Sequence, residues 1–187
     1  MRYDAVLSEA DAAGVLDEVL VATAHDTIAG RGVCQQGAGH YQFAAELDVS
    51  GERWRMVTSD NANYSYENGV VSFPVDPPRA AEFGVGMPLP VQLLHPVRLL
   101  LWGRGRESFR PMLVQRIGSF STLITFEHRD DPAFRGTLVL DRRVGVIRKR
   151  LLLGDAIVYT DVSVDEPLTG LQDVEFEPIT EWVPPEF

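Results

Sequence analysis

The segment 134–162, "FRGTLVLDRRVGVIRKRLLLGDAIVYTDV", decides the fold class of this 187-residue chain. Two short turn signals, Arg143 to Gly145 and the Gly154-Asp155 pair, separate its apolar runs. Strand-like runs at spacings of about ten residues, joined by such turns, indicate consecutive antiparallel strands. The segment therefore predicts strands over Phe134 to Asp141, Val144 to Leu153 and Ala156 to Val164.

The same segment is basic. It carries six cations against three anions, within a chain whose formal net charge is −10. Period-two alternation places Arg148 and Arg150 on one strand face, opposite Ile147 and Leu151, and Lys149 interrupts the pattern as in a strand near a sheet edge. We interpret the cations as a solvated outer face, because affinity for nucleic acid needs net positive surface. No nucleic-acid partner is expected.

A second meander precedes this one. Four glycines, from Gly30 to Gly39, predict that a short strand over about 27–33 ends in a loose connection. Period two then runs through "HYQFAAELDV", "ERWRMVTS" and "YSYENGVVSF", in which Asn68-Gly69 suits a type I′ hairpin turn. Five prolines between Pro74 and Pro90 predict an irregular arm. Strands over 112–117 and 119–128 follow it.

Two helical segments accompany the strands. Residues 9–24 carry apolar side chains at helical spacing after a start that resembles a capping box. Pro96 suits the first turn of a helix that runs to about Trp102, and Pro90 suits an earlier turn. The predicted fold is α+β: one strongly curved antiparallel sheet, a half-open barrel, covered by the N-terminal helix and the central helical segment. We expect one domain over 1–187, with an acidic tail over 161–187.

This order of elements resembles the lipoprotein-localisation fold, which includes the periplasmic lipoprotein carriers and the mycobacterial-type lipid-binding lipoproteins. The likeness rests chiefly on "TLVLDRRVGVIRKRLLLGDAIVYTDVSVDEPL" and on the Asn-Gly hairpin, and it spans most of residues 9–170. It implies a concave sheet face, covered by helices, that holds acyl chains.

The candidate ligand residues follow from this geometry. Apolar side chains of the strands and of the covering helix either form a packed core or, if the helix stands off the sheet, line an apolar cavity. These candidates are Phe43, Trp54, Met56, Leu93, Leu94, Val97, Leu100 and Leu101. The loop "WGRGRESFR" supplies Arg104, Arg106 and Arg110 as candidates for binding an anionic head group.

Signals of catalysis are weak. The four histidines lie far apart in the sequence, there is one cysteine, and no Gly-x-Ser-x-Gly elbow occurs. We expect a non-enzymatic binding protein for a lipid or other apolar ligand, without a metal or cofactor. The alternative is a cytoplasmic interaction module, regulatory or immunity-type, whose acidic tail binds a protein partner; from Asp161 onward the chain has eight acids and no Lys or Arg.

The ends of the chain bear on its location. The N-terminal stretch contains early acids and no uninterrupted apolar core after a basic region, so it does not resemble a secretory signal. No apolar run reaches the length of a membrane-spanning helix. We therefore expect a cytoplasmic location, or an extracytoplasmic one if an export segment has been removed, and no integral membrane protein.

Overall fold

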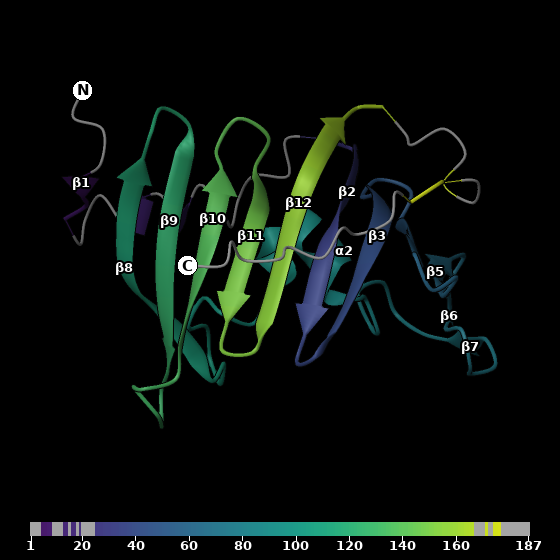
Figure 1. Cartoon of the computed structure of the whole chain (residues 1–187), viewed down its shortest axis with the longest axis horizontal. Coiled ribbons are helices and arrows are strands. Elements are labelled where there is room, and N and C mark those ends of the chain that lie inside the picture. The colour runs from purple at the N-terminus through teal and green to yellow at the C-terminus, as the bar shows by residue number, and fades with distance from the viewer. Residues whose placement is uncertain are drawn as a thin grey trace, which may run out of the picture.

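The computed structural model describes residues 5–8, 13–14, 16–17, 19, 25–166, 171 and 174–176. Within them, twelve strands form one sheet, in the order β1-β8-β9-β10-β11-β12-β2-β3-β4-β5-β6-β7 (Figure 1). The strands are β1 (Ala5–Val6), β2 (Thr27–Gln36), β3 (Gly39–Asp48), β4 (Arg53–Thr58), β5 (Asn63–Glu67), β6 (Val70–Ser72), β7 (Arg79–Ala80), β8 (Phe109–Ile117), β9 (Ser121–His128), β10 (Arg135–Asp141), β11 (Val146–Leu152) and β12 (Asp155–Val164).

Two meanders build this sheet, and both were predicted. The strands β2 to β7 form one, β8 to β12 form the other, and β12 joins them by pairing antiparallel with β2 (Figure 1). In the described part of the chain the sheet stays open, with β1 and β7 at its two edges. The predicted Asn68-Gly69 turn is present, since both residues have positive φ angles, 54° and 76°.

The predicted break after residue 33 is wrong, because β2 continues to Gln36. Gly32 lies inside the strand, paired with Phe43 of β3. A Cβ atom on Gly32 would lie 2.7 Å from the Phe43 ring. Glycine at this position therefore lets an aromatic ring lie across the strand without ending it.

The prediction of an edge position for β11 is also wrong, because this strand pairs with both β10 and β12. A bulge in the β10 pairing is the physical reason: Val139 pairs with Lys149, but Leu140 pairs with Ile147. The extra residue reverses the alternation beyond it. Arg150 thus points to the buried face, where it is 8% exposed, and not to the outer face with Arg148.

The central helical segment is shorter and earlier than predicted. It consists of α2 (Leu89–Leu94), with a proline in its first turn, and a single 3-10 turn, η1 (Pro96–Arg98). His95 between them is non-helical, with φ −128° and ψ 70°, as expected for a residue that precedes proline. Of the predicted helix over 9–24, the described residues 13–14, 16–17 and 19 are helical; the others lie outside the described residues.

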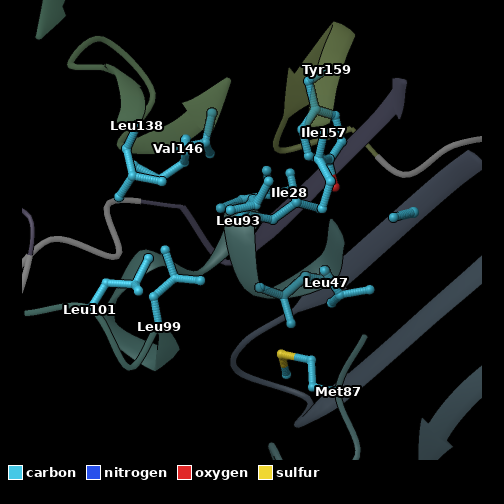
Figure 2. Packing of buried hydrophobic residues seen from close by; sticks show 14 of the residues in the cluster. Ile28, Leu47, Met87, Leu93, Leu99, Leu101, Leu138, Val146, Ile157 and Tyr159 are labelled. Carbon is cyan, nitrogen blue, oxygen red and sulfur yellow. The ribbon is translucent and has the colours of Figure 1, made fainter. Parts of the chain in front are cut away.

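The core lies between α2 and one face of the sheet. The helix packs on β2, β3, β4 and β11. Figure 2 shows Leu93 of α2 projecting toward the sheet residues Ile28, Ile157 and Tyr159. The Tyr159 hydroxyl donates a buried hydrogen bond of 2.7 Å to the Pro90 carbonyl, which ties the helix to β12.

Candidate functional site

The structure brings five of the predicted ligand residues together at the contact between α2 and the sheet. Phe43, Trp54 and Met56 come from β3 and β4, whereas Leu93 and Leu94 come from the helix, and all five are at most 2% exposed. They belong to one continuous hydrophobic cluster. The helix therefore packs directly on this part of the sheet, and a pocket lies beside the packed residues, with Met56 in its wall.

That space is a pocket of about 190 Å³ between the first residues of α2 and the adjoining ends of the strands. Strand residues make most of its wall, and the segment 88–90 covers it. Its lining residues are Cys34, Gln35, Gln36, Tyr41, Met56, Tyr64, Pro88, Leu89, Pro90, Arg150, Asp155 and Ile157. We call it the Arg150 pocket.

Strand register explains why these side chains meet. Arg150 pairs with Ile157, Ile157 with Cys34, and Cys34 with Tyr41, so four neighbouring strands contribute one row of residues. On its other side Arg150 pairs with Leu138, and the row continues through Ile124 to Val114. Directly paired residues point to the same face of a sheet. Arg150 is thus the one cation in a row that is otherwise apolar or neutral.

Two nitrogens of the Arg150 guanidinium lack partners within the described part of the chain. Its Nε and Nη1 atoms are buried and have no hydrogen-bond partner among the described residues. Burial lowers the pKa of Arg150 from its ordinary value, and the nearby Asp155 and Cys34 act in the opposite direction. Because arginine keeps its proton even when buried, the pocket holds a positive charge with unused donors.

Two further polar groups line the pocket beside Arg150. A side-chain hydrogen bond joins Tyr41 and Cys34. Burial is the main cause that raises the pKa of the Cys34 thiol, and it likewise raises the pKa of the Tyr41 hydroxyl. Both groups therefore stay protonated at neutral pH and contribute no negative charge.

The remaining predicted ligand residues lie elsewhere. Leu101 is buried in the core. Val97, Leu100 and Arg104 line an open groove of about 670 Å³ on the outside of the helical segment, where Leu100 is 68% exposed.

The three predicted head-group arginines do not converge on one pocket. Arg104 binds Glu107 at 3.1 Å, Arg110 binds Glu127 at 3.0 Å, and Arg106 is exposed.

The sequence also raised the questions of a metal site, a membrane-spanning helix and an acidic tail. Within the described ranges no group of three His, Cys, Asp or Glu side chains is arranged to hold a metal ion. No helix in the described part is long and apolar enough to cross a membrane. Of the acidic tail, the acids Asp161, Asp165, Glu166 and Glu175 are described, and Asp165 bonds to His25 at 3.0 Å; its other acids lie outside the described residues.

Sequence reasoning missed Arg150 because it placed Arg148 and Arg150 on one face of the strand and interpreted the interruption at Lys149 as the sign of an edge strand, whereas it marks a bulge. The five cations between residues 142 and 150 contain no signal that distinguishes the buried one. The sequence does contain a partial signal, the two successive apolar residues Val146 and Ile147. Such a pair next to alternating residues is compatible with a bulge, and both side chains are buried in the structure.

The fold belongs to the class of open, curved antiparallel sheets with a small helical cover, and solved structures of low sequence identity share it. One solved structure with a similar fold is the crystal structure of MucB. The match has a TM-score of 0.52 and 18% sequence identity, and it covers 95% of this chain and 70% of the MucB chain. The complex structure of Pseudomonas aeruginosa MucA/MucB gives a TM-score of 0.50 and 18% identity, covering 94% of this chain and 67% of that one. No protein-family model and no curated protein matches the chain.

Proposed function

We propose that this protein is a non-enzymatic binding protein and that its ligand, a molecule with an apolar body and a hydrogen-bond-accepting end, occupies the Arg150 pocket. One observation carries the proposal: a buried cation, two of whose nitrogens have no partner among the described residues, lines a pocket whose wall combines apolar and aromatic side chains with a few polar ones. Small-molecule sites combine an apolar wall with a few placed polar groups in this way.

The energetic argument is that Arg150 is costly in the free protein. A buried donor without an acceptor costs about 1–3 kcal/mol. A ligand that supplies the acceptor removes this cost and also buries its apolar part, at about 0.8 kcal/mol for each methylene group. Both contributions favour the bound state.

Native mass spectrometry of gently purified protein, followed by solvent extraction, tests the proposal. We expect a bound small molecule on the wild-type protein and its loss from Arg150→Met. Lys149→Met is the matched control, because it removes the neighbouring cation, which is exposed, and it should retain the molecule.

Two outcomes would count against the proposal. One is wild-type protein that carries no small molecule and takes up neither fluorescent fatty acid nor a smaller apolar probe. The other is an equal ligand content in Arg150→Met and the wild type, since the ligand would then lie outside this pocket.

A protein partner is a second proposal. The solved MucA/MucB complex shows that a protein of this fold assembles with another protein, and Asp161, Asp165 and Glu166 begin an acidic surface here. The partner would then be basic. A pull-down with wild-type protein and with a variant that has the tail acids changed to amides tests this; equal recovery of partners would contradict it.

A further inference from the structure

We propose that the ligand of the Arg150 pocket is a small monocarboxylate whose body is an aromatic ring or a short alkyl chain. This inference rests on the proposed function and adds the chemical class and the size of the ligand. It follows from three features of the pocket: the guanidinium of Arg150, the nearby Asp155, and the volume.

The donor geometry favours a carboxylate. The guanidinium is a planar fork of N–H groups that matches the two oxygens of a carboxylate. In Arg150 the unpartnered atoms Nε and Nη1 lie on different edges of the guanidinium, and each edge pairs one of them with Nη2, so a carboxylate binds through one of these edges. The other polar groups of the inner row, the Cys34 thiol and the Tyr41 hydroxyl, are neutral, so they do not repel it.

Asp155 limits the charge of the ligand. Its side chain lines the same pocket and lies near enough to Arg150 to influence its pKa. One positive and one negative charge already face the space. A monoanion is attracted by the close donors of Arg150, whereas a dianion such as a phosphate monoester adds a second charge that Asp155 repels. The pocket therefore favours a carboxylate over a phosphate.

The volume limits the ligand body. A cavity of about 150 Å³ lined by apolar side chains admits benzene, and the Arg150 pocket has about 190 Å³. Drug-sized sites have about 300–1,000 Å³. A six-membered ring or a chain of similar length fits against Met56, Leu89 and Ile157, whereas most of a long acyl chain would extend out of the open side of the pocket.

Isothermal titration calorimetry with five probes tests the class: benzoate, its alkyl counterpart hexanoate, benzamide, phenyl phosphate and palmitate. We expect benzoate or hexanoate to bind the wild type, and benzamide and phenyl phosphate to bind about tenfold more weakly or not at all. Arg150→Met should weaken benzoate binding by about tenfold or more, and Lys149→Met should leave it unchanged.

Asp155→Asn gives a readout that a merely structural role of Asp155 would not produce. Removing its charge should tighten benzoate binding and tighten phenyl phosphate binding more. If phenyl phosphate binds the wild type as well as benzoate does, or if Asp155→Asn leaves both unchanged, the proposed charge selection is wrong.

The size limit and the proposed function fail in different ways. Tighter binding of palmitate than of benzoate would overturn the size limit, and tighter binding of benzamide would overturn the carboxylate; either result keeps a binding protein with this pocket. If no probe binds and native mass spectrometry also finds no molecule on the wild type, the proposed function itself fails.

Discussion

Replacing Arg150 by methionine should stabilise the free protein while it abolishes ligand binding. Methionine is also long and unbranched, so it fills the same space beside Leu138 and Ile157, with which Arg150 pairs. The change removes two buried donors without partners. Because an unsatisfied buried group costs about 1–3 kcal/mol, and apolar replacement of buried charges is often stabilising, we expect the free energy of unfolding to rise by about 1–3 kcal/mol.

Urea unfolding followed by tryptophan fluorescence measures this change, provided that the m-value stays constant. The protein is first freed of any bound molecule by extraction and refolding. Lys149→Met serves as the control and should stay within about 0.5 kcal/mol of the wild type. A loss of stability in Arg150→Met would show that the guanidinium already has good partners in the free protein, and the reasoning for a ligand would be refuted.

Three further perturbations test the fold around the pocket. Tyr159→Phe should cost about 1–2 kcal/mol, because the Pro90 carbonyl loses its buried hydrogen bond of 2.7 Å. Gly32→Ala should cost about 1–3 kcal/mol, because the new Cβ would clash with the Val158 backbone carbonyl oxygen and would also lie 2.7 Å from the Phe43 ring. Burial, and secondarily Arg98, lowers the pKa of His95 from 6.5 to about 4. The unfolded chain therefore binds the proton more readily than the folded protein does. The free energy of unfolding should be highest above pH 6.5 and should fall as the pH is lowered toward 4, by about 3 kcal/mol at most.

Each of these perturbations has a control in the same chain. Tyr66→Phe removes a hydrogen bond of 3.3 Å to Ala81 and should cost less than Tyr159→Phe; a larger cost would contradict the role of Tyr159. Gly39→Ala meets no atom nearer than 3.6 Å and should be tolerated, so equal losses at both glycines would argue against the clash. His95→Gln should remove the part of the acid sensitivity that His95 causes, and an unchanged pH profile would assign it to other groups.

The meanders were predictable because their signals are local. Alternating strands, the Asn68-Gly69 turn and the glycine at 154 act through neighbouring residues, and the structure contains the strands and turns in that order. The pairing of β12 with β2, which closes the two meanders into one sheet, joins residues more than a hundred positions apart. No local pattern indicates such a contact.

The candidate site was less predictable than the fold. The stripe of Leu93 and Leu94 was recognised as a covering face, and it is buried. Whether a cavity lies beneath it depends on how closely α2 approaches the sheet, and a contact distant in sequence, the hydrogen bond of Tyr159 to Pro90, helps to hold the helix there. The inward direction of Arg150 depends on a bulge opposite β10, which is a property of strand pairing and not of β11 alone.

The most direct test of the central claim is the NMR signal of the Arg150 Nε–Hε group, assigned by its absence from Arg150→Met. Titration of the ligand-free protein with benzoate should shift this signal progressively, as an acceptor replaces the missing hydrogen-bond partner. The signals of exposed arginines such as Arg106 serve as internal references and should stay in place. An Arg150 signal that does not move, while benzoate binds by calorimetry, would contradict the claim that this buried arginine holds the ligand.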